Sequence, residues 1–327
     1  MRRVAVSLLA GLTVISCTDL PVSDSSLKRT EYVMGTMLSI SVGGRSPADL
    51  DRALDSAFAV VHDLDSKLSN YDSASELSRI NREAPGEVSV SPETFEFLEL
   101  TLAAAHESSG ALNPAIGPVI KLWGFYGDDM KVPDANDLDF ALSLVDYSSI
   151  VLDSATRTVR LSEGMLLDPG ATGKGYALNL ADKVLRQMEI PTVFFDFGGQ
   201  FYRRGADTVN MAIRHPRSDS VVASLIRMAT GSVATSGDYE RYFEQDGVRY
   251  AHIVDPRTGR PVPDRVSVTV FAEDPFVADY LSTALFVLGS ESDLLNLYPG
   301  SGALFASWQD DSLVFLARGS WSDLEGP

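Results

Sequence analysis

A short glycine-rich segment with one lysine directly precedes an apolar stretch of helical spacing. It reads Asp168-Pro-Gly-Ala-Thr-Gly-Lys174-Gly175. Backbone N–H groups at a helix start, together with one ammonium group, can bind an anion such as a pyrophosphate. The segment is not a Walker A loop, which needs glycine in place of Asp168 and Ser or Thr in place of Gly175, and Leu178 breaks a Gly-x-Gly-x-x-Gly motif. The alternative interpretation is a tight turn that simply begins a helix.

Three oxygen-bearing side chains share one face of an otherwise apolar helical segment, residues 277–288. Asp279, Ser282 and Thr283 stand at positions i, i+3 and i+4. A carboxylate is costly to bury without a partner, and Mg²⁺ accepts one or two carboxylates together with hydroxyl or carbonyl oxygens. The spacing predicts a magnesium site. The alternative is a structural bond between Asp279 and a basic residue or a backbone group elsewhere.

A histidine lies near the end of a predicted strand, in His252-Ile-Val-Asp255-Pro. Because an imidazole with a pKa near 6.5 suits proton transfer at neutral pH, His252 is a candidate general base, although a structural histidine fits the segment equally well.

Gly198 and Gly199 follow another apolar strand and indicate close approach of the backbone to a flat or phosphorylated ligand. Ser236 lacks the strand–turn–helix context of a nucleophile elbow, which argues against a serine hydrolase.

The elements that must position these groups can be predicted from periodicity. Four segments have the apolar spacing or the boundary residues of helices: 48–68, 91–110, 174–189 and 274–289. Residues 127–137 are expected to form a surface loop, and Asp246-Gly247 a hairpin turn. The β-rich runs are 31–42, 150–152, 158–161, 192–197, 221–228, 248–254 and 265–271. Because hairpins outnumber strand–helix–strand units, the pattern favours an α+β fold with mixed sheets and packed helices.

Composition limits the function classes. The 327 residues include 27 Lys and Arg against 45 Asp and Glu, which gives a net charge of −18. Without a long basic run, nucleic acid is not an expected partner. Cys17 is the only cysteine of the sequence, which excludes intrachain disulfides, cysteine-based zinc sites and iron–sulfur clusters. The length fits one large domain or two small ones.

The N-terminus has the features of an export signal. Met1-Arg2-Arg3 precedes an apolar run over residues 4–15 that is too short to span a bilayer stably. The run ends in Val14-Ile15-Ser16-Cys17, which resembles the bacterial lipoprotein processing box. We therefore expect residues 1–16 to be a signal peptide, Cys17 to carry the lipid that holds the protein to a membrane surface, and residues 17–28 to be a serine-rich flexible tether. The alternative is an ordinary signal peptide with an incidental cysteine.

Taken together, the motifs resemble the FAD:protein FMN transferase (ApbE) family. The resemblance extends in order over most of the chain after the signal peptide. Its blocks are Met34-Gly-Thr36; Ser69-Asn-Tyr-Asp72 with Ser75-Glu-Leu-Ser-Arg-Ile-Asn81; Ser109-Gly-Ala-Leu-Asn-Pro114 with Gly117-Pro118 and Leu122-Trp-Gly-Phe125; residues 168–177; Gly198-Gly199; Ala234-Thr-Ser-Gly-Asp-Tyr239 with residues 250–259; and Ala278-Asp279 with Ser282-Thr283.

The resemblance implies an α+β, T-fold-related domain over residues 29–327. Such a protein binds FAD, cleaves its pyrophosphate with Mg²⁺, and attaches FMN through a phosphoester bond to Thr or Ser of exported acceptor flavoproteins of electron-transfer complexes, releasing AMP. By motif, the implied metal set is the Ala171 carbonyl with Asp279 and Thr283, and Ser282 close by. The implied flavin-nucleotide contacts are Met34, Tyr71, Ala111, Leu112, Asn113, Asp168, Lys174, Gly198, Gly199 and Ile253.

The sequence departs from the family pattern at a few positions. Asn113 replaces a usual Asp, Asn179 replaces a common Asp, and Pro169 and Ala171 vary the turn before the lysine. Asn113 can still form hydrogen bonds with a nucleotide edge, although it lacks the charge. The role implied for Ala171 uses its backbone, so it tolerates the side chain.

Three functions remain compatible with the sequence. They are an FMN transferase, an Mg²⁺-dependent FAD pyrophosphatase that releases FMN and AMP, and a non-catalytic flavin-binding lipoprotein. The Asp279 and Thr283 pair argues against the third. For the first, His252 is the expected acceptor of the hydroxyl proton, and the expected location is the periplasmic side of the bacterial inner membrane.

Overall fold

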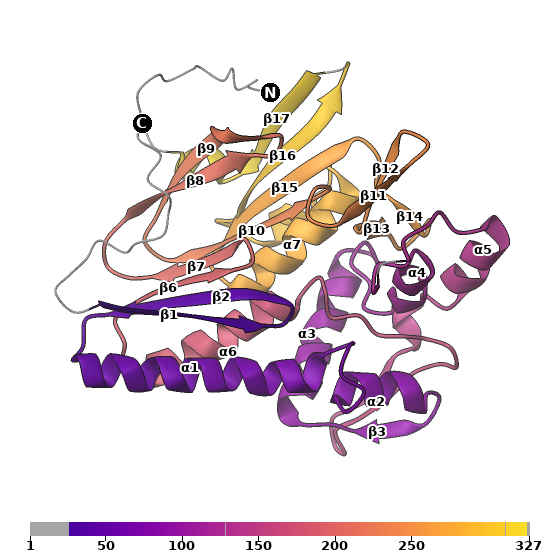
Figure 1. Ribbon diagram of the computed structural model, residues 1–327, viewed down its shortest axis with the longest axis horizontal. Coiled ribbons are helices and arrows are strands. Elements are labelled where there is room, and N and C mark those ends of the chain that lie inside the picture. The colour runs from indigo at the N-terminus through magenta and orange to yellow at the C-terminus, as the bar shows by residue number, and fades with distance from the viewer. Residues whose placement is uncertain (1–25, 128, 311, 326–327) are drawn as a thin grey trace.

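The computed structural model describes residues 26–127, 129–310 and 312–325, and it omits the side chains of residues 219 and 220. Its framework is an eight-stranded sheet in the order β1-β2-β6-β7-β10-β15-β16-β17, and every neighbouring pair is antiparallel (Figure 1). The strands are β1 (Ser26–Val33), β2 (Thr36–Gly43), β6 (Thr192–Phe197), β7 (Gln200–Arg204), β10 (Gly231–Gly237), β15 (Arg265–Ala272), β16 (Gly302–Gln309) and β17 (Ser312–Gly319).

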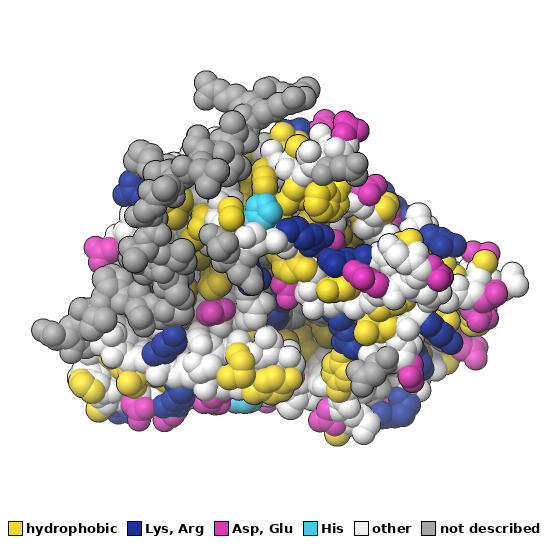
Figure 2. Space-filling model, turned by 45° about the horizontal axis from the view of Figure 1, so that its top comes forward, with side chains coloured by type: hydrophobic (Ala, Val, Ile, Leu, Met, Phe, Trp, Pro, Cys, Tyr) yellow, Lys and Arg dark blue, Asp and Glu magenta, His cyan; other side chains and the backbone are white. Residues whose placement is uncertain are grey.

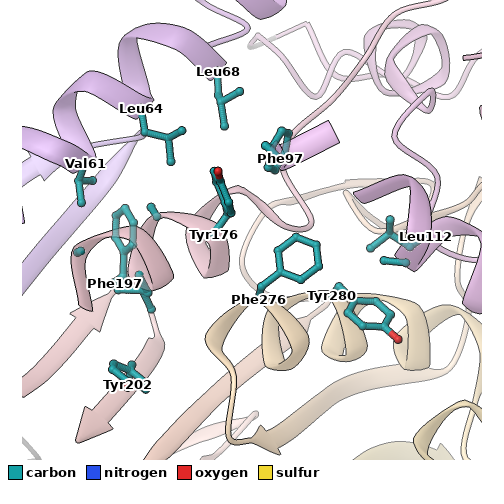
Figure 3. Close-up of a cluster of buried hydrophobic side chains, with 14 of the residues drawn as sticks. Val61, Leu64, Leu68, Phe97, Leu112, Tyr176, Phe197, Tyr202, Phe276 and Tyr280 are labelled. Carbon is teal, nitrogen blue, oxygen red and sulfur yellow. The ribbon is translucent and has the colours of Figure 1, made fainter. Parts of the chain in front are cut away.

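One face of the sheet packs against helices (Figure 1). The main ones are α1 (Pro47–Leu68), α3 (Pro92–Glu107), α6 (Gly173–Gln187) and α7 (Pro275–Leu288). Tyr176 of α6 lies between Leu64 of α1 and Phe97 of α3, and Phe276 of α7 lies nearby (Figure 3). The opposite face is covered by the hairpin of β8 (Val209–His215) and β9 (Ser218–Met228) and by α8 (Trp321–Leu324). Alternation along β15 explains both layers, since Val270 belongs to the first core and Phe271 to the second.

Smaller elements extend from one end of this framework (Figure 1). A three-stranded sheet in the order β3-β5-β4 lies beside α2, and α4 packs against α5 around Trp123. The bounds are α2 (Glu76–Glu83), β3 (Glu87–Ser89), α4 (Gly117–Leu122), α5 (Ala135–Ser143), β4 (Val151–Asp153), β5 (Thr158–Arg160), β11 (Tyr242–Gln245), β12 (Val248–Ala251), β13 (Val254–Asp255) and β14 (Arg260–Pro261), with 3-10 turns at Tyr147–Ser149 and Leu294–Leu297. Acidic and basic side chains are interspersed over the face shown in Figure 2.

The α+β prediction is confirmed, as are the four predicted helices within a few residues at each end. The Asp246-Gly247 turn is also confirmed: it joins β11 to β12, with φ angles of 53° and 77°. None of the helices in the described ranges is long and apolar enough to span a membrane.

Three boundary predictions are wrong. The single strand predicted over residues 31–42 is a hairpin, because Met34 and Gly35 adopt positive φ angles of 49° and 77° and reverse the chain between β1 and β2. The tether predicted over residues 17–28 ends earlier, since residues 26–28 pair with residues 41–43; backbone pairing outweighs the serine-rich composition there. The loop predicted over residues 127–137 ends at Asp134, whose side chain caps α5.

Candidate functional site

A cavity of about 300 Å³ opens where the start of α6 meets α7, β10 and the loops around residues 111–126 and 252–256. Twelve of the residues expected to function line it, although they come from distant parts of the chain. They are Tyr71, Ala111, Leu112, Asn113, Asp168, Ala171, Lys174, Gly198, His252, Ile253, Asp279 and Thr283. The volume is within the range of small-molecule sites.

The start of α6 faces this cavity. Thr172 is the N-cap residue, but its side chain makes no capping bond, and the half-buried Lys174 has no hydrogen-bond or ion-pair partner anywhere in residues 26–127, 129–310 and 312–325. Gly175 permits the close contact of α6 with α7, because a Cβ there would lie 2.5 Å from the Pro275 carbonyl oxygen. The free ammonium and the helix start together provide the conditions for anion binding.

Asp279 on α7 lies beside this helix start and is only 5% exposed. Its Oδ2 accepts a hydrogen bond of 2.8 Å from the Gly175 N–H, and no group in the described part of the chain donates to Oδ1. Burial raises the pKa of the carboxyl to about 6, partly opposed by the positive charge of Lys174 and by the Gly175 N–H. The carboxylate therefore has unused capacity to bind a cation or a hydrogen-bond donor.

Three hydroxyl groups, two of them on the same helix as Asp279, are connected to one another and to the Asp279 backbone. Ser236 of β10 lies 2.8 Å from Ser282 and 3.1 Å from Thr283, measured between the side-chain oxygens. Ser282 also forms a 2.8 Å hydrogen bond with the Asp279 backbone carbonyl. Thr283 and Ser236 line the cavity, whereas Ser282 does not. Ser282 therefore lies one layer behind the surface of the site.

His252 directly follows β12 and also lines the cavity. Its Nδ1 lies 3.1 Å from the Arg241 carbonyl oxygen, which can only accept a hydrogen bond, so Nδ1 carries the proton of the neutral ring. Burial, with the positive charges of Lys174 and Arg241, lowers the pKa of the imidazole to about 4. At neutral pH the ring is therefore uncharged, with the lone pair on Nε2 available to accept a proton.

Asp168 is held by its own surroundings. Its carboxylate accepts hydrogen bonds from the Tyr126 hydroxyl at 2.6 Å, the Asn70 amide at 3.2 Å and the Gly170 N–H at 2.8 Å. Burial raises its pKa, and these three donors oppose that shift. Tyr71, 71% exposed, lies edge-on to Tyr126 with ring centroids 6.3 Å apart. The exposed Tyr71 ring therefore lies next to Tyr126, the residue that donates a hydrogen bond to the Asp168 carboxylate.

Among the other expected contacts, Asn113 uses its Oδ1 to accept the Ala115 N–H at 2.9 Å, which leaves its amide nitrogen for another group. Gly198 and Gly199, with φ angles of 56° and 88°, form the tight turn between β6 and β7, and Gly198 alone of the two lines the cavity. Met34 does not line it either, although its Cε comes 3.3 Å from the position of a Cβ on Gly173 at the start of α6.

Several residues that line the cavity or support its lining were not predicted from the sequence. Tyr126 and Asn70 hold Asp168, Arg241 orients His252, and Ser236 binds Thr283 through hydrogen bonds. Tyr126 and Asn70 adjoin or belong to motif blocks, and that proximity is the signal that could have found them. The orientation of His252 comes from a backbone carbonyl, so no residue type encodes it.

The donor set suits Mg²⁺ better than a transition metal. No group of three or more His, Cys, Asp or Glu side chains positioned for a metal occurs among the residues that the structure describes. Asp279 with its free Oδ1, the Thr283 hydroxyl and the Ala171 segment instead offer one carboxylate with neutral oxygens at one cavity wall. Mg²⁺ is commonly held by one or two carboxylates, with the remaining ligands from water and substrate phosphates.

Comparisons with known proteins agree with this arrangement. The sequence model of the ApbE family matches residues 34–305. A relative named FAD:protein FMN transferase, from Treponema pallidum (strain Nichols), is 36% identical over 304 residues, which cover 85% of this chain and 83% of the relative. The crystal structure of the ApbE protein from Thermotoga maritima gives a TM-score of 0.85 at 30% identity, covering 92% of this chain and 100% of that chain. A structure of the flavin transferase ApbE from Vibrio cholerae gives a TM-score of 0.81 at 26% identity, covering 91% and 99%.

Proposed function

Because the chain belongs to the ApbE family, we propose that it is an Mg²⁺-dependent FAD:protein FMN transferase that modifies Thr or Ser of exported flavoproteins and releases AMP. One observation carries the proposal. An unpartnered ammonium, a buried carboxylate with one free oxygen and a neutral imidazole line the same cavity at the start of a helix. Transfer from a dinucleotide pyrophosphate can use all three: the ammonium to bind phosphate, the carboxylate to hold a cation that neutralises phosphate charge, and the imidazole to accept the hydroxyl proton.

The reaction joins an acceptor hydroxyl to the FMN phosphorus of FAD. The new oxygen–phosphorus bond forms, the bond from that phosphorus to the bridging oxygen breaks, and AMP leaves with the electron pair. His252 takes the hydroxyl proton on Nε2, while the Arg241 carbonyl holds the ring in the required tautomer. Lys174 and the N–H groups of α6 bind the phosphate oxygens.

Asp279 and Thr283, with the Ala171 carbonyl, would hold Mg²⁺. When bound, the ion supplies neutralisation of phosphate charge and polarisation of the phosphorus under attack. Asp279 suits this role because its Oδ2 is already positioned by the Gly175 N–H and its Oδ1 remains free. In the absence of a cation, burial disfavours the charged form of the carboxyl group and raises its pKa.

We propose that the protein works at the periplasmic side of the bacterial inner membrane, held by a lipid on Cys17. Cys17, the signal peptide over residues 1–16 and most of the tether lie outside the described residues. The first described strand begins at Ser26, nine positions after Cys17. Nine extended residues reach at most about 30 Å, so the anchor would keep the first strand close to the membrane surface.

The proposal is tested by incubating the purified protein with FAD, Mg²⁺ and an acceptor peptide, and by measuring FMN, AMP and flavinylated peptide by mass spectrometry. A transferase yields AMP together with peptide that carries FMN. Asp279→Asn keeps the shape of the side chain but removes its charge, so both transfer and FMN release should be lost while the melting temperature stays close to that of the parent protein.

The outcomes separate the alternatives. Release of FMN and AMP that ignores the peptide, with no flavin on it, would refute the transferase in favour of a pyrophosphatase. FAD that binds but stays intact in the presence of Mg²⁺ would indicate a flavin-binding lipoprotein. Unchanged turnover by Asp279→Asn would remove Asp279 from the metal site.

A further inference from the structure

A chain of three hydroxyl groups connects β10 to α7 at the cavity wall. It runs from Thr283 through Ser236 to Ser282, with oxygen–oxygen distances of 3.1 and 2.8 Å, and it ends on the Asp279 backbone carbonyl, 2.8 Å from Ser282. Ser236 is 9% exposed and Ser282 is 1% exposed. No other side-chain hydrogen bond is made by these three hydroxyls within the described residues. Among the described side chains, the three hydroxyls therefore bond only to one another, and the series ends at the Asp279 carbonyl.

The end of the chain determines the direction of every proton in it. A hydroxyl group has one proton to donate, whereas a carbonyl oxygen can only accept. Ser282 must therefore donate to the Asp279 carbonyl. Ser236 then donates to Ser282, because the proton of Ser282 is already used. For the same reason, Thr283 donates to Ser236.

We propose that Ser236 is a positioning residue which turns the Thr283 hydroxyl into an acceptor-only ligand. With the Thr283 proton directed to Ser236, only lone pairs of Oγ1 remain for the cavity, on the same helix face as the free Asp279 oxygen. An oxygen in this state suits a cation and cannot donate a hydrogen bond to a phosphate. Hydrogen bonds in such a chain also polarise one another, which makes the Thr283 oxygen, the first donor of the chain, a stronger acceptor. The inference rests on the proposed Mg²⁺ site.

The direction of the chain gives Ser282 a role although it does not line the cavity. Without its hydroxyl, Ser236 loses its only acceptor other than Thr283. Ser236 would then donate to Thr283, and the Thr283 proton would be released toward the cavity, where it opposes a cation. Removal of either serine should therefore weaken cation binding, and removal of both should weaken it no further than Ser236→Ala does, because the groups act as one unit.

The test is a titration of the purified protein with Mn²⁺ in place of Mg²⁺, with free Mn²⁺ measured by electron paramagnetic resonance. Loss of a partner that orients a metal ligand typically reduces affinity 10- to 100-fold, so we expect about a 10-fold loss or more in Ser236→Ala and in Ser282→Ala. Ser236→Thr keeps a hydroxyl and should bind nearly as well as the parent protein. Ser224→Ala is the matched control, since Ser224 is a strand serine of similar burial, 8% exposed, with hydrogen bonds to Trp321 and Glu325 instead.

Parent-like Mn²⁺ affinity in a folded Ser236→Ala protein would overturn the proposal. So would a loss in Ser236→Ala that Ser282→Ala does not share, because the protons would then have no fixed direction. Asp279→Asn reports on the metal site itself: if it binds Mn²⁺ as well as the parent protein, the proposed site is wrong whatever the hydroxyl chain does.

The hydroxyl chain can also be examined without a metal. Neutron diffraction from crystals exchanged into deuterium oxide locates hydroxyl deuterons directly. We expect the Thr283 deuteron on the line to Ser236, the Ser236 deuteron on the line to Ser282, and the Ser282 deuteron on the line to the Asp279 carbonyl. A Thr283 deuteron that points into the cavity would contradict the proposal, even if the cation site proves correct.

Discussion

At the scale of single residues, the site depends on groups that the protein leaves without partners. Lys174 lines the cavity without a hydrogen bond or ion pair to any described residue. Placed at the start of α6, its ammonium should bind the phosphates of FAD and not the flavin ring. We therefore expect Lys174→Ala to weaken FAD binding about 10- to 150-fold, the equivalent of one charge-assisted hydrogen bond, and to leave riboflavin binding almost unchanged. Isothermal titration with both ligands measures the difference, and equal losses would contradict this placement.

His252 links the site to the pH dependence of stability. Its folded-state pKa of about 4 lies below the unfolded value near 6.5, so between these values the unfolded chain binds a proton that the folded chain does not. The free energy of unfolding should therefore fall as the pH decreases from about 6.5 toward 4, by at most about 3 kcal/mol from this group. His252→Asn keeps a donor for the Arg241 carbonyl but does not titrate.

Urea unfolding at pH 7 and pH 5 provides the measurement for His252. The parent protein should lose more stability between these two pH values than His252→Asn does. Identical losses in the two proteins would show that the imidazole is not held in its neutral form. At pH 7, the same variant should transfer FMN about 10²- to 10⁴-fold more slowly, because it lacks the proton acceptor, while FAD binding is retained.

At the scale of elements, the contact between α6 and α7 aligns the anion-binding helix start with the carboxylate. A Cβ on Gly175 would lie 2.5 Å from the Pro275 carbonyl oxygen, 2.7 Å from the Phe276 Cα and 2.8 Å from the Asp279 Cβ. The two helices would have to separate, which would also lengthen the bond from the Gly175 N–H to Asp279. Gly175→Ala should destabilise the fold by about 1–3 kcal/mol and reduce FAD turnover.

Gly127→Ala is the matched control for Gly175→Ala. No atom of the described residues, apart from its chain neighbours, lies within 4 Å of a Cβ at Gly127, and Gly127 does not have a positive φ angle. The control should unfold at the same urea concentration as the parent protein. Equal stability of both alanine variants would mean that the two helices tolerate a wider spacing than the structure shows.

At the scale of the whole molecule, the proposed lipid on Cys17 determines where the enzyme meets its acceptors. Cys17→Ser removes the modified atom and should release the protein from membranes into the soluble fraction. Immunoblots of membrane and soluble fractions after a high-salt wash measure the distribution. Retention of the variant on washed membranes would show that something other than this cysteine anchors the protein, without affecting the assignment of the cavity.

Much of the fold could be predicted from local patterns. The helices over α1, α3, α6 and α7 were found because apolar spacing and capping residues depend only on neighbours along the chain. Strand β10 was missed, since Gly231-Ser-Val-Ala-Thr-Ser-Gly237 consists mostly of small residues and has Val233 as its only large apolar side chain. It is extended because β7 and β15 pair with it on both sides, which is a tertiary cause.

The sequence alone also determined which residues are candidates for chemistry, because residue type and spacing limit what Lys174, Asp279 and His252 can do. Only the tertiary structure decided how they act together. It placed the three around one cavity although they are separated by as many as 105 positions, and through a backbone carbonyl it left the lone pair of the neutral His252 ring on Nε2. It also buried Asp279 against Gly175 and brought Ser236 of β10 within hydrogen-bond distance of Ser282 and Thr283 of α7. Burial, tautomer and proton direction depend on atoms from other elements of the fold, and local sequence does not specify those neighbours.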